Sequence, residues 1–344
     1  MPRFTLPSMK LRYADALLPS LLLLVYITIT YLSGFALMIN GHSVVGWLFG
    51  ILLLAHSMIL IAYLIHDLSH QAFFMDRRAN EYLGNVLSFL VGASYTPYAD
   101  LRSKHMRHHV DRADVIAIDY RAFLLRHPLL LRVFQMAEWL YIPAIDILMH
   151  GLVIASPFIF KSYKALRTRV LIMLAIRIVL FAILAWTAWT AWTAWTAWQA
   201  LVGYCLAYVL FIHVLRLMDM HQHTYDVVVG VDEKGHLRPD ADYERQNTYS
   251  NPLGNSRLIN LLVLNFGYHN AHHEKPTAPW YRLPALHREL YGDKPTLNTF
   301  PIREVLSNLH RHRVARVIAS DTTRMGGETP NFVGLYGVSF LTTI

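Results

Sequence analysis

Eight histidines stand in three clusters whose spacing is typical of metal ligands. Residues three or four apart on a helix lie on one face, about 5–6 Å apart at Cβ, so each cluster can direct two or three ring nitrogens at one point. Four protein ligands complete a zinc site, so eight imidazoles suit two neighbouring transition-metal ions, and imidazole binds iron, copper, zinc and nickel. The sequence therefore predicts a two-metal site formed by His66 and His70, by His105, His108 and His109, and by His269, His272 and His273.

The composition predicts that these histidines belong to a membrane protein. Of the 344 residues, 54% are hydrophobic and 16% are charged, a balance that favours an integral membrane chain over two soluble domains. A helix needs about 20 apolar residues to cross a hydrocarbon core of roughly 30 Å. Four segments of the chain meet this length, and we expect membrane spans at about 16–38, 44–65, 170–191 and 199–218.

The spans are expected to form two hairpins, so that every histidine cluster lies on one side of the membrane. Positive charge marks the cytoplasmic side, and both hairpin turns lack it, since no Lys or Arg stands between Arg12 and Arg77 or between Arg177 and Arg216. We therefore predict an all-α integral membrane protein with a cytoplasmic histidine-rich cap. The net charge of +8 fits this topology and anionic head groups, and we expect no nucleic-acid partner.

The segments outside the spans divide the chain further. Two of them, 82–98 and 128–160, are apolar but interrupted by Gly, Pro or charged residues, so we predict interfacial or partly embedded helices there. The sequence leaves open an even number of additional membrane crossings in this region. The domain boundaries that follow are a cytoplasmic N-terminus at 1–15, a membrane domain at 16–318 and a C-terminal tail at 319–344.

An Ala-Trp-Thr repeat runs from Ala185 to Trp198. A period of three sweeps the tryptophans around the surface of a helix. This spread suits lipid head groups better than a one-sided binding site, because tryptophan favours the membrane interface.

The three clusters resemble the histidine boxes of the membrane fatty acid desaturase family, which read His-x-x-x-His, His-x-x-His-His and His-x-x-His-His. Here they are HDLSH, HMRHH and HNAHH, in the same order along the chain, and the resemblance covers roughly residues 17–289. In that family the boxes bind two irons that activate O2. The resemblance therefore implies a di-iron centre with O2 as co-substrate, although related hydroxylases share the same boxes.

The resemblance also implies a ninth ligand soon after the fourth span. The segment Gln222-His223-Thr224 looks like that region, so His223 is expected to be this ligand, with His221 as the next choice. His213 lies inside the fourth span, where a hydrogen-bonded or cavity-facing histidine is as well supported as a metal ligand. His56 lies ten residues before His66 and is expected to be structural.

Carboxylates and amides near the ligands are candidates to orient them, because a ligating imidazole usually donates its second N–H to such a group. The first candidates are Asp67, Asp111, Asp219 and Asn270, of which Asn270 is an alternative holder of a metal-bound water. Asp114, Asp226 and Glu274 are also within a few residues of the ligands.

Together these features predict an O2-dependent acyl-lipid desaturase, which removes two hydrogens from adjacent methylenes of a fatty acid chain. Desaturation is favoured because acyl-lipid desaturases of that family have three residues between the histidines of the first box, as here. A membrane di-iron hydroxylase of a lipid or hydrocarbon is the alternative. A histidine-rich metal transporter is less favoured, because its ligands should line a path through the membrane.

The electrons must come from another protein. The one cysteine, Cys205, lies within the fourth expected span, so the chain can hold no internal disulfide and no iron–sulfur cluster. No cytochrome b5-like haem motif and no flavin or nicotinamide fingerprint is present. We expect a ferredoxin or a cytochrome b5-like donor with its reductase, a lipid acyl substrate, and a multi-pass protein of a bacterial inner membrane, or of the endoplasmic reticulum in a eukaryote.

Overall fold

Four long apolar helices form the body of the protein. The structure, a computed structural model, describes residues 7–40, 43–116, 119–189, 194–225, 228–230, 240–292, 298–319 and 339–342. Within these ranges, four helical segments are long and apolar enough to cross a membrane, as the sequence predicts: Leu17–Asn40, Val44–Ser69, Lys161–Trp186 and Trp198–Asp219. They belong to α1 (Leu17–Asn40), α2 (Val44–Ser69), the short 3-10 helix η1 (Lys161–Leu166) with α8 (Arg167–Trp189), and α9 (Ala194–Asp219).

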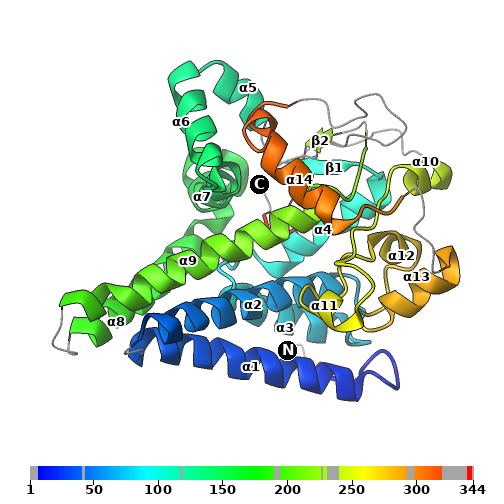
Figure 1. The fold of residues 1–344 in the computed structure, drawn as a ribbon, viewed down its shortest axis with the longest axis horizontal. Coiled ribbons are helices and arrows are strands. Elements are labelled where there is room, and N and C mark those ends of the chain that lie inside the picture. Colours follow the sequence, from blue (N-terminus) through cyan, green and yellow to red (C-terminus); the bar gives the residue numbers. More distant parts are fainter. Residues whose placement is uncertain are drawn as a thin grey trace, which may run out of the picture.

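The long helices pack around α2. This helix contacts both α1 and α9, and α9 also contacts α8 (Figure 1). Residues of α2 from Leu54 onward are almost all buried, whereas α1 and α8 expose Leu, Ile and Val side chains over much of their length. Exposed apolar faces of this size suit a lipid environment and not water. The structure is therefore that of a membrane protein with α2 at its centre.

Smaller helices gather near the end of α2 that carries the first histidine pair (Figure 1). Because α4 contacts α2 directly, the second histidine cluster is brought beside the first. These helices are α3 (Arg77–Leu90), α4 (Tyr98–Asp111), α10 (Ala241–Gln246), α11 (Arg257–Leu261), α12 (His269–Glu274) and α13 (Leu283–Tyr291). Two later elements pack elsewhere, α14 (Ile302–His312) against α9 and the 3-10 helix η2 (Ala315–Val317) against α6.

The predicted interfacial segment at 128–160 forms two helices that meet at a sharp bend. They are α6 (Pro128–Trp139) and α7 (Ala144–Ile159), inclined by 119° and preceded by the short α5 (Tyr120–Leu125). A buried arginine of α9 ties both to the body, since Arg216 Nη2 lies 2.7 Å from Glu138 Oε2 of α6 and Arg216 Nε lies 3.6 Å from Asp146 Oδ2 of α7. A buried arginine needs such acidic partners to offset its desolvation.

The all-α expectation misses one small element. Strands β1 (Asp114–Ile116) and β2 (Val228–Gly230) form a two-stranded parallel sheet. Each strand has only three residues, and its partner is more than a hundred positions away in the chain. No local sequence pattern therefore predicts this sheet. The sheet joins the end of α4 to the chain that follows α9. Most side chains of the Ala-Trp-Thr repeat, Asp226 and most of the tail at 319–344 lie outside the described residues.

Candidate metal centre

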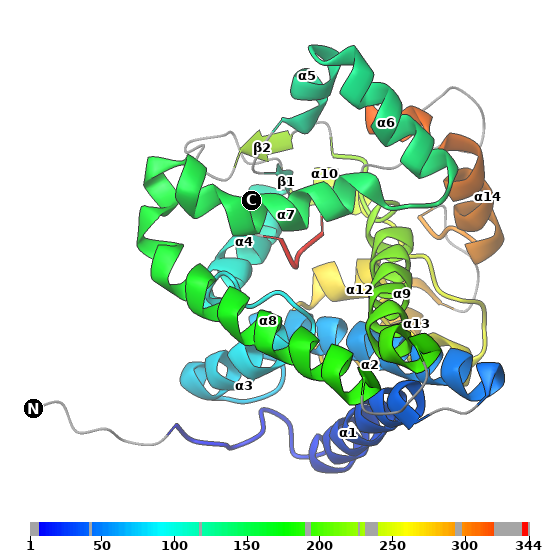
Figure 2. The ribbon, with the colours of Figure 1, turned by 90° about the vertical axis from the view of Figure 1, so that its left-hand side faces the viewer.

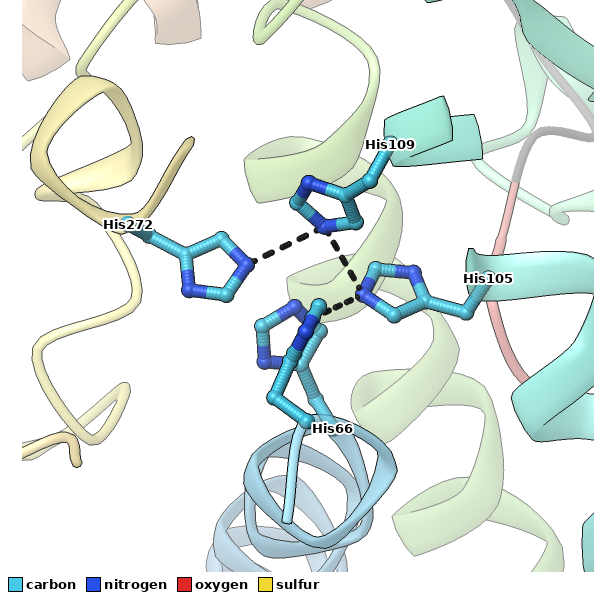
Figure 3. Close-up of side chains that lie close together, drawn as sticks. His66, His105, His109 and His272 are labelled. Atoms are coloured by element: carbon cyan, nitrogen blue, oxygen red, sulfur yellow. Dashed lines mark hydrogen bonds between the residues drawn. The ribbon is translucent and has the colours of Figure 1, made fainter. Parts of the chain in front are cut away.

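All eight box histidines and His223 meet in the interior, in two neighbouring groups. One group joins five residues whose ring nitrogens lie within 4.8 Å of one another, and the other joins four. The five are His66, His70, His105, His109 and His272, and the four are His108, His223, His269 and His273. Figure 3 shows His66, His105, His109 and His272 with their rings turned toward a common point.

The first box lies at the end of α2. The helix continues past Ile65 to Ser69, and His70 caps it with its backbone N–H bonded to Asp67 and Leu68 carbonyls. His66 and His70 are therefore one helical turn apart and face the same way, as their spacing predicts. Both side chains are buried.

The second box lies on α4, whose last turn carries His108 and His109. His105 and His109 are one turn apart and join the first group, while His108 turns to the second group. The helix ends at Arg112, which has a left-handed backbone with φ of 50°. This end brings the Ala113 carbonyl to 3.0 Å from His108 Nδ1, which donates to it and leaves Nε2 facing the other histidines.

The third box forms the short helix α12. Leu264 and Asn265 both have positive φ, at 50° and 59°, and reverse the chain between α11 and α12. Asn tolerates this left-handed conformation better than most residues, and Asn265 Nδ2 holds the turn by donating to the Trp280 carbonyl at 3.0 Å. His272 then faces the first group, and His269 and His273 face the second.

His223 is outside any helix and is fixed by a β-bridge to Thr248. On either side of it, Thr224 N donates to Asn247 O at 2.9 Å and Tyr249 N donates to Gln222 O at 2.8 Å. His223 Nε2 lies 2.7 Å from His269 Nε2 and 2.9 Å from His108 Nε2. His221 turns elsewhere, with its Nε2 3.4 Å from Arg316 Nη2.

The nitrogen spacings fit two metal ions. Ligands at about 2.0–2.1 Å from an ion lie roughly 2.9–3.4 Å apart when their bonds meet at 90° to 109°. The nitrogens of His105 and His109 lie 3.2 Å apart and those of His109 and His272 3.3 Å, within this range, while those of His70 and His105, at 2.7 Å, are slightly closer. His66 Nε2 and His273 Nε2 are buried without a hydrogen-bond partner among the described residues, as atoms reserved for an ion would be.

Burial keeps these imidazoles in the neutral form that binds metal. Burial, with repulsion from neighbouring histidines, lowers the pKa of His108 to about 3. The same causes, burial first, hold the pKa values of His105, His109, His269 and His272 well below the usual value. At neutral pH the nitrogens are therefore available as acceptors.

The acidic groups near the ligands play different parts. Asp67 Oδ1 lies 3.8 Å from His66 Nδ1, and its Oδ2 accepts from Trp280 N at 2.9 Å. Asp111 forms an ion pair with Arg107 at 3.0 Å, and Glu274 pairs with Arg245 at 2.8 Å. Asp114 Oδ1 lies 3.9 Å from His108 Nδ1.

The other two first candidates are Asp219 and Asn270. Asp219 lines a cavity next to the histidines, and neither of its carboxylate oxygens has a hydrogen-bond partner within the described ranges. Asn270 Nδ2 donates to the Asn298 carbonyl at 3.2 Å, so this side chain is bound to the loop before α14.

The sequence did not single out Glu244, which makes a direct hydrogen bond to a box histidine. His273 Nδ1 donates to Glu244 Oε1 at 2.9 Å, and Arg112 Nε donates to Glu244 Oε2 at 2.7 Å. Although burial opposes it, these two hydrogen bonds hold the pKa of Glu244 below its usual value. Glu244 lies 29 positions before His273, so proximity along the chain could not have found it.

Two histidines outside the boxes have other partners. His213 Nε2 lies 2.5 Å from the Tyr141 carbonyl, and His56 Nδ1 lies 2.9 Å from the Tyr26 hydroxyl. Neither belongs to the two groups of histidines described above.

Comparison with protein families gives a match for this chain. A family model described as fatty acid desaturase matches residues 43–300, which is well over half of the chain and includes all nine clustered histidines. A search of curated proteins finds no match.

Proposed function

The chain belongs to the fatty acid desaturase family, as the three histidine boxes predict, and we propose that it is an O2-dependent di-iron desaturase acting on the acyl chain of a lipid. The observation that carries this proposal is the meeting of nine imidazoles in two adjacent groups, six of them buried and three partly buried. Two groups of this kind suit two transition-metal ions better than one. Their interior position also limits the access of water to the reaction site.

In this proposal each group of histidines holds one iron. The group of five has His66, His70, His105, His109 and His272 as ligands, and the group of four has His108, His223, His269 and His273. When bound, the two irons supply the activation of O2 and the abstraction of hydrogen from an unactivated methylene. The protein holds ligands in position, since Glu244 and the Ala113 carbonyl accept hydrogen bonds from the ring nitrogens of His273 and His108 that face away from the groups. Asp67 Oδ1 lies 3.8 Å from the corresponding nitrogen of His66.

The reaction is balanced by electrons from outside the chain. Removing two hydrogens from adjacent methylenes forms a double bond, and O2 is reduced to two waters with two further electrons and two protons. A separate ferredoxin or cytochrome b5-like donor with its reductase supplies these electrons. The three-residue gap of the first box supports desaturation over hydroxylation, in line with the resemblance to acyl-lipid desaturases.

The charge pattern supports a cytoplasmic position for the centre. Spans α1 with α2 and α8 with α9 form two hairpins, with both uncharged turns on the far side. In this proposal the host membrane is a bacterial inner membrane, with the endoplasmic reticulum as the counterpart in a eukaryote. A donor protein then reaches the histidines from the cytoplasm.

Expression in a host whose lipids are profiled tests the reaction. We expect new double bonds that require O2, and we expect His108→Ala to abolish them because it removes a ligand of one group. Alcohols in place of alkenes would make the chain a hydroxylase. Identical products from His108→Ala would show that the boxes are not catalytic.

Iron analysis of the purified protein tests the two-metal site and the ninth ligand. We expect about two irons per chain and a clear loss of iron in His223→Ala. The neighbouring His221→Ala is the matched control, and its iron content should stay near that of the unmodified chain. Tightly bound zinc, with no oxidised lipid, would contradict the oxygenase proposal and favour a metal transporter or sensor.

A further inference from the structure

A short piece of the C-terminal tail lies inside the protein, beside the histidines. Ser339–Thr342 is the red segment that Figure 2 shows within the ring formed by α4, α7, α8 and α12. Phe340, Leu341 and Thr342 are buried, with exposed fractions of 8%, 3% and 1%. Nothing in the proposed reaction uses this segment.

The segment places an aromatic ring against the metal-binding side chains. The Phe340 ring centre lies 5.5 Å from that of His66 and 6.1 Å from that of His105. Phe266 and Tyr63 complete the surroundings of Phe340 at 6.2 Å and 6.4 Å. An apolar side chain therefore lies directly beside two of the clustered histidines.

The cavity at this point is too small for a lipid chain while the segment is present. It is lined by Phe340 and by histidines of both groups, and its volume is about 50 Å³. Pockets for small molecules usually measure roughly 300–1,000 Å³. A substrate chain can reach these histidines through this cavity only if the Phe340 side chain moves out of it.

A buried lysine binds the segment through backbone oxygens. Lys104 Nζ donates to the Thr342 carbonyl at 2.7 Å and to the Ser339 carbonyl at 3.3 Å. Lys104 is on α4, next to His105, and lines the same cavity. A buried amine that loses such acceptors must find other oxygens, because an unpaired buried polar group is costly.

We propose that Ser339–Thr342 occupies the binding site of the substrate, and that Lys104 binds an oxygen of the substrate head group there once the segment has left. The ligand class is a lipid with a carbonyl, carboxylate or hydroxyl oxygen next to its apolar chain. The tail and the substrate exclude each other, with Phe340 in the place of the chain and the two carbonyls in the place of the head group. This inference rests on the proposed function, because that function makes the cavity a binding site for a lipid substrate.

Cysteine labelling tests the exclusion without turnover. Leu341→Cys is introduced into the full chain together with Cys205→Ser, because Cys205 is exposed, and the rate of maleimide labelling is measured by mass. Palmitate should speed labelling of position 341 several-fold, because it displaces the segment. Hexadecane, which has the same chain without an oxygen, should have a much smaller effect.

Two controls separate displacement from general loosening. Val317→Cys in the same background is a fully buried position away from this cavity, and neither lipid should change its labelling. Lys104→Met should raise the labelling of position 341 without lipid and remove the difference between palmitate and hexadecane. Labelling that palmitate leaves unchanged, or that both lipids speed equally in the chain with Lys104, would overturn the proposal.

A second measurement does not depend on the cysteine variant. A chain that ends at residue 338 should bind radiolabelled palmitate more tightly than the full chain, because the competing segment is gone. Equal affinities would contradict the proposal. The two proposals can fail separately. If the chain makes no unsaturated lipid but palmitate still speeds the labelling of position 341, the proposed reaction is contradicted, while the competition between the segment and the lipid is supported.

Discussion

At the scale of single residues, the orientation of each imidazole depends on what its outer nitrogen contacts. His273 is the clearest case, because its Nδ1 donates to Glu244 and its Nε2 faces the other histidines. Glu244 is in turn fixed by Arg112, at the end of the helix that carries the second box. The three residues form one chain of hydrogen bonds from the surface to the centre, so the carboxylate sets both the tautomer and the direction of the ligand.

Replacing this carboxylate should weaken the site without unfolding the protein. We expect Glu244→Gln to lower iron affinity or activity by about 10–100-fold, the usual effect of losing a group that orients a metal-ligating histidine. The measurement is iron per chain after dialysis against a weak chelator, with the optical spectrum of the bound iron as a second readout. A spectrum and an iron content equal to those of the unmodified protein would remove Glu244 from this role.

Glu274→Gln is the matched control for Glu244. Glu274 directly follows His273 but pairs with Arg245, a partly exposed side chain, at 2.8 Å. Exposed ion pairs contribute about 0–1 kcal/mol, so iron content and stability should barely change. A large loss of iron in Glu274→Gln would instead assign the orienting role to the residue nearest in sequence.

At the scale of elements, the position of α2 depends on a close contact with α1. A Cβ added at Gly50 of α2 would lie 2.9 Å from the Gly34 carbonyl oxygen of α1. One added at Gly34 would lie 2.9 Å from the Gly50 carbonyl oxygen and from Leu54 N of α2. The two helices therefore approach along a stripe where only glycine fits. Since α2 ends in the first histidine box, this contact helps to set the position of His66 and His70.

A methyl group at this contact should push the helices apart. Gly50→Ala is expected to lower stability by about 1–3 kcal/mol, because overpacking forces a backbone shift. Thermal unfolding in detergent measures the effect. Gly151→Ala on α7 is the matched control, since a Cβ there meets nothing within 4 Å, and the better helix propensity of Ala should give a gain of up to about 1 kcal/mol. Equal melting temperatures for the two variants would contradict the close-contact argument.

At the scale of the whole molecule, the charge pattern predicts which face of the membrane carries the centre. The link between α1 and α2 should face away from the cytoplasm, while α3 should face the cytoplasm with the histidines. Val45 near the start of α2 and Arg78 on α3 are both exposed positions for a single cysteine. They lie at opposite ends of the span between them, so they report opposite sides.

In a Cys205→Ser background, a membrane-impermeant maleimide applied to intact cells should label Val45→Cys and not Arg78→Cys. Lysis of the cells should make Arg78→Cys reactive. Labelling of Arg78→Cys in intact cells would reverse the orientation, and labelling of both positions from outside would require a different number of crossings between them.

The sequence alone was sufficient for features that depend on local spacing. Histidines three and four apart and uncharged runs of about 20 residues follow from the geometry of a single helix, so the three boxes, the four long apolar helices and the family could be read from the chain. His223 was reached from the resemblance. The strands β1 and β2, by contrast, were missed because a segment of three residues is too short to show the hydrophobic periodicity of a strand.

The tertiary structure decided how these parts combine. It divided the nine histidines into a group of five and a group of four, with His109 and His108 on different sides although they are adjacent in the chain. It brought Glu244 to His273 and the distant Phe340 to His66. Such contacts join residues from separate elements and depend on the packing of the whole chain, whereas sequence periodicity specifies only which face each residue takes on its own helix.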